Sequence, residues 1–256
     1  MKVLVFDTET TGLPQDRNAS IHETTKWPHI IQLSYILYDT DKQQVDTFAD
    51  HIIRLASDVH ISPESIAIHK ITKEISQVQG IPLTQALNAF KAVLARADLL
   101  IGHNLLFDKR MLMVEFSRHK IRNFLYRHDQ KIPEYCTMKN TVDVCAIPFA
   151  NQTTEQTYNK YPTLSELHNH LFQTMPKGVH NALVDVLVCL RCYIQHTCGY
   201  DILASAEGAG TSAEGADASA EASAEASADA SAGTSAEGAE ASASIHIPPE
   251  LYALLL

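Results

Sequence analysis

Apolar residues in the first third of the chain are grouped into runs with the length and composition of β-strands. The runs cover 3–7, 28–37 and 45–53, and each contains several β-branched or aromatic residues. Short apolar runs of this kind favour strands, especially where turn-forming residues such as those at 12–14 follow them. Their close spacing predicts a three-stranded antiparallel meander at the start of the fold.

The pattern then changes to the period of an amphipathic helix. Over 84–97, the larger apolar side chains fall mainly on one side of a helix. A fourth strand over 98–103 leads directly into a helix from about 107 to 119, and a fifth strand is expected over 141–145. Antiparallel strands followed by alternating strands and helices predict an α/β fold with a mixed sheet.

Two later helices are predicted from their capping residues. Glu166 lies three positions after Thr163, which is the spacing of a capping box, and the pair predicts a helix over 163–172. Asn181 is a good N-cap for a long apolar helix that runs to about residue 196.

The composition divides the chain into three segments. A domain of residues 1–203 is followed by a linker over 204–244 that is almost entirely Ala, Ser, Glu, Gly, Asp and Thr. Like charges repeated along this linker, with Gly and Ser between them, predict a disordered tail. The segment 245–256 is mostly apolar and is expected to dock on a partner protein. The alternative is an end derived from a vector or a truncation, with no role.

The net charge of the chain comes from its tail. Residues 201–256 contain ten acidic side chains and no Lys or Arg, whereas residues 1–200 contain 20 acids and 20 bases. A protein that coats long nucleic acids usually has a basic excess, because its affinity comes from neutralising many phosphates. A neutral domain is better suited to holding a few nucleotides at a strand end, where metal ions supply the positive charge.

The cysteines and the hydropathy of the chain indicate its expected cellular compartment. Five cysteines, an odd number, and no secretory leader before the first apolar run predict an intracellular, cytoplasmic protein with reduced thiols. No apolar run approaches the roughly 20 residues that cross a bilayer, so no membrane association is expected.

Four carboxylates and one histidine lie among apolar or small neighbours. Asp7 and Glu9 are two apart on the first strand, so both point to one face. Asp108 opens a helix, and His180 and Asp185 bracket the start of another. Each acid alone has an ordinary explanation, such as a solvated strand face or a favourable helix start. Asp185, however, lies among Leu and Val residues, where a charge is costly unless it is paired or binds metal.

Together these residues favour one kind of chemistry. Carboxylates are the ligands of hard divalent cations, and two such ions about 3.5–4 Å apart promote phosphoryl transfer. The pattern therefore predicts a metal-dependent nuclease. Lys109 and Arg110 either contact phosphate or simply begin a solvated helix, and both readings stay open. Trp27 and Tyr35 are aromatic residues of the kind that stack on bases, but core packing is favoured for them.

Three segments resemble the motifs of the DEDDh exonucleases, the DnaQ-like group that includes the proofreading subunit of bacterial replicative polymerase. They are Asp-Thr-Glu-Thr-Thr-Gly-Leu-Pro at 7–14, Gly-His-Asn-x-x-Phe-Asp at 102–108, and His180 with Asp185. The resemblance covers about residues 1–200. It implies a ribonuclease-H-like fold with a five-stranded mixed central sheet.

The resemblance also implies roles for single residues. Asp7 would bridge two Mg²⁺ or Mn²⁺ ions, Glu9 and Asp185 would hold the ion that activates water, and Asp108 would serve the second ion. His180 would take the proton from the attacking water, as an imidazole does near neutral pH. The residues expected to contact the 3′-terminal nucleotide are Thr8, Thr10, Gly12, Leu13 and Asn104.

The function expected from the sequence is a 3′→5′ exonuclease that acts on single-stranded 3′ ends of DNA, of the proofreading or repair type. An exoribonuclease that trims RNA is the alternative within enzymes, because nothing in the motifs reads a 2′-hydroxyl. The alternative of another class is an interaction module with a nuclease fold, tethered to a DNA polymerase or another protein through 245–256.

Overall fold

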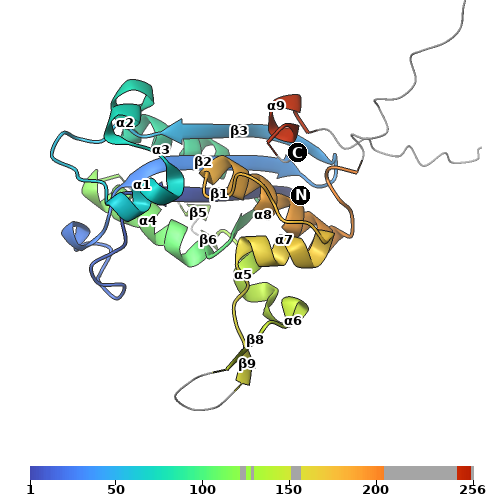
Figure 1. The fold of residues 1–256 in the computed structure, drawn as a ribbon. Coiled ribbons are helices and arrows are strands. Elements are labelled where there is room, and N and C mark those ends of the chain that lie inside the picture. Colours follow the sequence, from blue (N-terminus) through green and yellow to red (C-terminus); the bar gives the residue numbers. More distant parts are fainter. Residues whose placement is uncertain (122–124, 128–129, 151–156, 205–246, 255–256) are drawn as a thin grey trace, which may run out of the picture.

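A five-stranded mixed sheet forms the centre of the protein (Figure 1). The computed structural model describes residues 1–121, 125–127, 130–150, 157–204 and 247–254. The strands lie in the order β3-β2-β1-β4-β7, with β1 in the middle. β1 pairs antiparallel with β2, which pairs antiparallel with β3, while β4 and β7 continue the sheet in parallel. The strands are β1 (Lys2–Thr10), β2 (Ile30–Asp39), β3 (Gln44–Ile52), β4 (Leu99–Gly102) and β7 (Glu134–Cys136).

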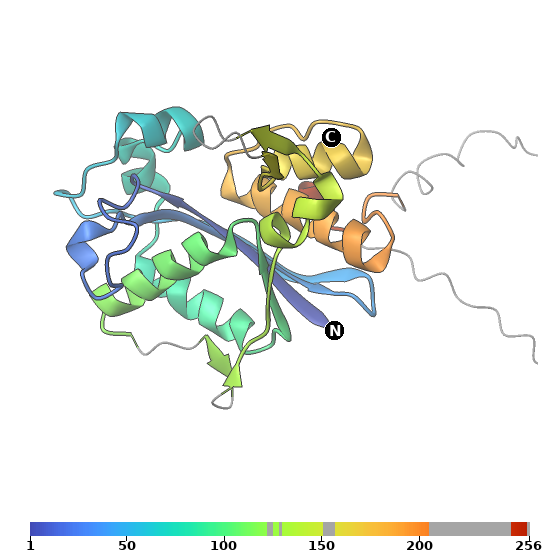
Figure 2. The same ribbon diagram turned by 90° about the horizontal axis from the view of Figure 1, so that it is seen from below.

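Helices cover both faces of this sheet. Figure 2 shows the sheet between one layer containing α3 and α4 and another containing α7 and α8. The helices are α1 (Pro63–His69), α2 (Lys73–Gln79), α3 (Leu83–Leu94), α4 (Leu105–Arg118), α5 (Thr137–Asn140), α6 (Val142–Cys145), α7 (Leu164–Phe172), α8 (Ala182–Cys198) and α9 (Pro249–Tyr252), with a 3₁₀ turn η1 (Thr24–Lys26). Two small hairpins join β5 (Tyr126–Arg127) to β6 (Gln130–Lys131) and β8 (Pro148–Ala150) to β9 (Thr157–Asn159).

The alternation of side chains along β1 divides the core in two. Leu4 and Phe6 point to the α3/α4 face, where Phe6 meets the ring of Phe90 edge-on at 5.3 Å between centroids. Val3 and Val5 point to the opposite face and pack in the cluster that includes the apolar residues of α8. Because successive strand residues alternate between faces, Asp7 and Glu9 continue the α8 side and Thr8 continues the α4 side.

Most of the elements expected from the sequence are confirmed, as is the mixed five-stranded sheet flanked by helices. The capping box at Thr163 and Glu166 is present, and the Asn181 side chain accepts from the first turn of α8. Trp27 and Tyr35 are buried in the core, as favoured.

The expected fifth strand over 141–145 is wrong, because these residues form a helix. Thr137 and Thr141 are both buried, four residues apart, and the Thr141 hydroxyl donates to the Thr137 carbonyl at 2.8 Å. The two threonines are spaced at one helical turn, and the helical backbone continues through Val142 and Val144 despite their β propensity. The sheet edge is taken instead by the three residues Glu134–Cys136, too short a run to stand out in the sequence.

A buried glutamine joins α8 to the sheet. Gln32 on β2 is 1% exposed, and its Nε2 donates to Asp50 Oδ1 at 2.7 Å. Its Oε1 accepts from the backbone N–H of Ala182, the first residue of α8, at 3.3 Å. Gln32 lies directly across from Glu9 in the β1–β2 register. The start of α8 is therefore fixed beside the end of β1.

The C-terminal segment packs on the domain itself. Leu251 in α9 is 1% exposed and belongs to the same core cluster as Val3 and Val5, with Ile247 and Tyr252 packed against it. The predicted linker at 204–244 lies outside the described residues except for Ala204. Docking of 245–256 on a partner stays a prediction. None of the helices in the described ranges is both long and apolar enough to span a bilayer.

We expect Leu251→Ala to release the C-terminal segment from the domain. Truncating a buried leucine costs about 2–5 kcal/mol, and each 1.4 kcal/mol is tenfold in an equilibrium. Chymotrypsin cleavage after Tyr252, followed by mass spectrometry, should accelerate at least tenfold. Leu254, which is 39% exposed in the same segment, provides the control as Leu254→Ala. Equal cleavage rates for both variants would contradict the packing described.

We expect Gln32→Leu to loosen the first turn of α8. The change removes the acceptor for the Ala182 N–H, and an unsatisfied buried polar group costs about 1–3 kcal/mol. Hydrogen exchange of the amides at 182–185 should speed up at least fivefold. Ser34→Ala is the matched control, because the Ser34 hydroxyl also donates to Asp50 Oδ1, at 2.6 Å, yet forms no hydrogen bond with α8 in the described part of the chain. Exchange that accelerates equally in both variants would contradict a role of the Gln32–Ala182 hydrogen bond in holding the first turn of α8.

Candidate active site

Three carboxylates meet where β1 ends against α8. Asp7 and Glu9 come from the α8 face of β1, and Asp185 comes from the first turn of α8. One oxygen from each of the three carboxylates lies within 4.8 Å of the others. In the described residues this is the only group of three or more acidic, histidine or cysteine side chains with such spacing. The sequence prediction that these three acids gather is thus supported by the geometry.

The segment that leads into α8 places His180 in the same cavity. Asn181 caps the helix, with Oδ1 accepting from Leu183 N at 3.1 Å and from Val184 N at 3.4 Å. His180 precedes this cap in a left-handed conformation, with φ of 72°, and its backbone N–H donates to Asp185 Oδ2 at 3.1 Å. A cavity of about 400 Å³ is lined by Asp7, His180 and Asp185 among other residues. The His180 side chain is exposed there.

The fourth carboxylate is held on the other side of β1. Asp108 lies in the first turn of α4 and is 3% exposed. Its Oδ1 accepts from the Thr8 hydroxyl at 2.7 Å and from the Thr8 N–H at 3.2 Å. Asn104, with φ of 63°, makes the sharp turn from β4 into α4. Asn tolerates this left-handed conformation better than most residues. Thr8 therefore positions Asp108 and does not face solvent.

Burial is the main cause that raises the pKa values of all four acids. Burial, and then the charges of Asp108, Asp185 and Glu9, hold the pKa of Asp7 well above its usual range. Burial, and then the charges of Asp185 and Asp108, raise the pKa of Glu9 to about 8. Burial raises the pKa of Asp108 to about 7 against the hydrogen bonds from Thr8, and that of Asp185 to about 6. The cluster is thus unfavourable as a set of bare anions at neutral pH.

This donor set fits a divalent cation. A hard cation prefers carboxylate oxygens, and its positive charge would offset the repulsion that raises these pKa values. Asp7, Glu9 and Asp185 can offer one oxygen each to a single ion. Asp108 is close enough to raise the pKa of Asp7, but its Oδ1 is engaged with Thr8.

The residues expected to contact a terminal nucleotide line a neighbouring cavity of about 560 Å³. Of these residues, Thr8, Thr10, Gly12 and Leu13 contribute to its wall, and so does the acid Glu9. Their accessibility differs, because Thr8 and Thr10 are 6% and 8% exposed whereas Leu13 is 72% exposed. The Thr10 hydroxyl donates to the Gly12 carbonyl at 2.8 Å and shapes the turn. Asn104 lies apart from this group and lines two other cavities.

Sequence reasoning missed several residues around the site. Ser62, Ser65 and Ile68 of the α1 region form the far wall of the cavity that holds Glu9. His103 lines the cavity that holds Asp7, and its Nδ1 and Nε2 lie 3.0 and 3.1 Å from Thr137 Oγ1 and the Pro162 carbonyl. Burial lowers the pKa of His103 to about 4, so this imidazole is neutral at ordinary pH. The sequence feature that could have pointed to His103 is its position within the second motif, at 102–108.

Comparison with solved structures supports the fold. The chain resembles E. coli exonuclease I in complex with a dA16 oligonucleotide, with 15% identity and a TM-score of 0.56. The likeness covers 76% of this chain and 41% of that protein. The structure of exonuclease I described as suggesting how processivity is achieved matches with 16% identity, a TM-score of 0.57 and the same coverage. At this identity the match shows the fold alone, and it confirms the ribonuclease-H-like exonuclease fold expected. The chain spans less than half the length of exonuclease I.

Comparison at the level of sequence assigns the family. No curated protein sequence matches the chain significantly. A family model described as RNase_T, Exonuclease, matches residues 4–193. This range contains all three motifs, from Asp7 to Asp185, and covers well over half of the chain. The chain therefore belongs to the RNase_T exonuclease family.

Proposed function

We propose that the protein is a 3′→5′ exonuclease that hydrolyses the terminal phosphodiester of a single-stranded DNA end and releases a nucleoside 5′-monophosphate. The observation that carries the proposal is the convergence of Asp7, Glu9 and Asp185 within 4.8 Å, with His180 lining the same cavity. Membership in an exonuclease family supports the same reading.

The acids of the site would hold two Mg²⁺ or Mn²⁺ ions. Asp7, Glu9 and Asp185 would bind one, and Asp7 with Asp108 would bind the second. When bound, such ions lower the pKa of a coordinated water and stabilise charge on the phosphate oxygens. The protein holds Asp7 and Glu9 on a central strand and Asp185 on a capped helix, so the three oxygens are already gathered before any ion arrives.

His180 would act as the general base. Its side chain is exposed in the cavity shared with Asp7 and Asp185, so it can reach a water placed between the carboxylates and the scissile phosphate. The Asn181 cap and the hydrogen bond from the His180 N–H to Asp185 fix the backbone beside the imidazole. A base in this position accepts the proton of the attacking water and passes it to solvent.

The open cavity beside Glu9 would receive the terminal nucleoside. Leu13 lines this cavity and is 72% exposed, so its apolar side chain can pack against a base. Structures of E. coli exonuclease I with dA16 and dT13 oligonucleotides support DNA as the substrate class. No contact in the cavity identifies a reader of a 2′-hydroxyl, so the exoribonuclease remains the second candidate. The proofreading role and a polymerase partner stay predictions.

Digestion of single-stranded DNA and RNA, each labelled at the 3′ or the 5′ end, tests the activity. With Mg²⁺, the wild type should shorten DNA stepwise from the 3′ end, and the ratio of DNA to RNA rates selects the substrate. His180→Ala should lower kcat about 10²–10⁴-fold, the usual contribution of a general base. Manganese binding measured by calorimetry should survive in this variant and be lost in Asp7→Asn. Cleavage from the 5′ end, or full activity of Asp7→Asn, would refute the proposal.

The raised pKa of Glu9 predicts a pH-dependent gain in stability for Glu9→Gln in metal-free buffer. The folded pKa, about 8, exceeds the ordinary value of 4.5, so ionising Glu9 costs folded-state stability progressively across that window. The gain in Tm should be negligible near pH 4.5 and reach on the order of 5 °C above pH 8.

Glu74→Gln is the control for this measurement. The Thr72 side chain lowers the pKa of Glu74, so its replacement should not produce a gain that grows with pH. Calorimetric scans from pH 4.5 to 8.5 decide between the outcomes. A constant difference between Glu9→Gln and the wild type would mean that the pKa of Glu9 is not raised in the folded protein.

A further inference from the structure

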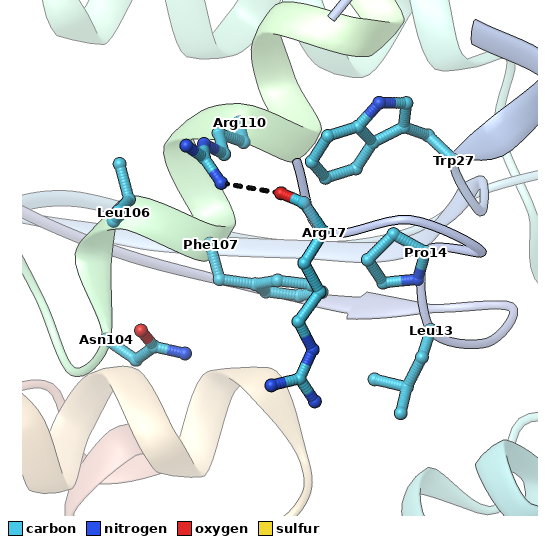
Figure 3. Close-up of a pocket in the computed structure, with 8 residues that line it drawn as sticks. All are labelled: Leu13, Pro14, Arg17, Trp27, Asn104, Leu106, Phe107 and Arg110. Atoms are coloured by element: carbon cyan, nitrogen blue, oxygen red, sulfur yellow. Dashed lines mark hydrogen bonds between the residues drawn. The ribbon is translucent and has the colours of Figure 1, made fainter. Parts of the chain in front are cut away.

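A third pocket shares Leu13 and Phe107 with the terminal-nucleotide cavity. It has a volume of about 320 Å³ and is lined by Leu13, Pro14, Arg17, Trp27, Asn104, Leu106, Phe107 and Arg110 (Figure 3). Leu13 and Phe107 also line the cavity that holds Glu9, and Asn104 also lines the cavity that holds Asp7 and His180. The pocket therefore adjoins both cavities that contain the carboxylates, through these shared residues.

The lining combines positive charge with flat apolar surface. Two arginines contribute to it, and no carboxylate does. Arg17 is exposed, and in Figure 3 its guanidinium extends away from Trp27 toward the end of the pocket where Asn104 and Leu13 lie. Among the described residues, no hydrogen bond or ion pair of this guanidinium is found. The ring of Phe107 and the 41% exposed side chain of Leu106 supply the apolar wall.

The loop that carries Arg17 is fastened to α4 from two places. Arg110 Nη1 donates to the Arg17 carbonyl at 3.0 Å (Figure 3). Two turns further along the helix, Arg118 Nη2 donates to the carbonyls of Thr24 and Trp27 at 2.6 and 2.5 Å. Arg118 is itself held by the fully buried Glu115 at 2.5 Å. These bonds hold the pocket in shape before a ligand binds, which reduces the entropy lost on binding.

The chemistry of the pocket matches a nucleotide. A guanidinium pairs with phosphate through two parallel hydrogen bonds, and bases pack on aromatic and apolar surfaces of single-strand binding sites. A pocket of this size also falls in the usual range for small-molecule sites. The four acids nearby repel a polyanion, so a strand that reaches them needs compensating positive charge on its path.

We propose that this pocket binds the nucleotide on the 5′ side of the scissile bond, with its phosphate on Arg17 and its base against Phe107 and Leu106. The inference rests on the proposed function, since it assumes that the scissile phosphate lies at the carboxylates. The terminal nucleoside then occupies the Glu9 side of Phe107, and the preceding nucleotide occupies the Arg17 side. Arg17 contacts the strand and leaves the reacting atoms to the acids and His180.

Two substrates distinguish binding in this pocket from catalysis at the carboxylates. The p-nitrophenyl ester of thymidine 5′-monophosphate presents a terminal nucleotide with no nucleotide on its 5′ side. A twelve-residue single strand, as DNA and as RNA of the same sequence, extends into the pocket. The variants are Arg17→Ala, Arg17→Lys and Lys42→Ala, the last removing an exposed charge from the β2–β3 turn, at the opposite end of β1 from Asp7 and Glu9.

We expect Arg17→Ala to lower kcat/KM for the oligonucleotide about tenfold relative to the ester. The slope of log kcat/KM against log salt should become shallower by about 0.7, the value for one phosphate contact on a single strand. Arg17→Lys should recover part of the loss, since lysine keeps the positive charge but cannot form the two parallel hydrogen bonds of a guanidinium. Lys42→Ala should leave the ratio of the two substrates as in the wild type.

Other results would overturn the inference. An Arg17→Ala ratio equal to that of Lys42→Ala contradicts a contact in the pocket, and a loss confined to DNA or to RNA contradicts a phosphate contact. If the wild type hydrolyses neither substrate, the proposed function fails. Fluorescence anisotropy of a 5′-labelled oligonucleotide with Ca²⁺ then tests the pocket alone. Weaker binding by Arg17→Ala than by Lys42→Ala supports it, and equal binding refutes it.

Discussion

The burial of four carboxylates close together is the constraint that organises this protein. Burial raises the pKa values of Asp7, Glu9, Asp108 and Asp185, and repulsion from the neighbouring acids raises those of Asp7 and Glu9 further. Such a cluster persists only if the surrounding structure holds it against its own charge. The pairing of β1 with β2 supplies that hold for Asp7 and Glu9. Asp185 is held by a capped helix and Asp108 by two hydrogen bonds from Thr8.

The two faces of β1 give the acids different surroundings. Asp7 and Glu9 face α8, whereas Thr8 faces α4 and reaches Asp108. One strand thus contacts both helix layers through consecutive residues, and the site lies around the strand end. The buried Gln32 completes the arrangement by fixing the start of α8 across from Glu9. Packing of the two helix layers and placement of the acids therefore depend on the same few residues.

Much of the fold could be read from the sequence, because its signals are local. The short apolar runs predicted the long strands, the helical period predicted α3, and the caps at Thr163 and Asn181 predicted α7 and α8. The strand over 141–145 failed, because the segment is anchored by Thr137, which hydrogen-bonds with both the nearby Thr141 and the Gly102 carbonyl, distant in sequence. The same limit applies to the site. Gln32 and the α1 wall were not predicted at the site, because their roles arise only when β2 and α1 pack beside β1.

The placement of the acids has a consequence for how the site moves. Asp7 and Glu9 pair with Ser34 and Gln32 of β2, whereas β4 pairs only with residues 3–5 of β1, so these two carboxylates move when β1 separates from β2. His180 instead lies in a turn before α8, with a left-handed backbone and an exposed side chain. The carboxylates on β1 are thereby tied to strand pairing at the centre of the sheet. Motion that admits a nucleic-acid strand or releases a product would then occur on the His180 side of the site.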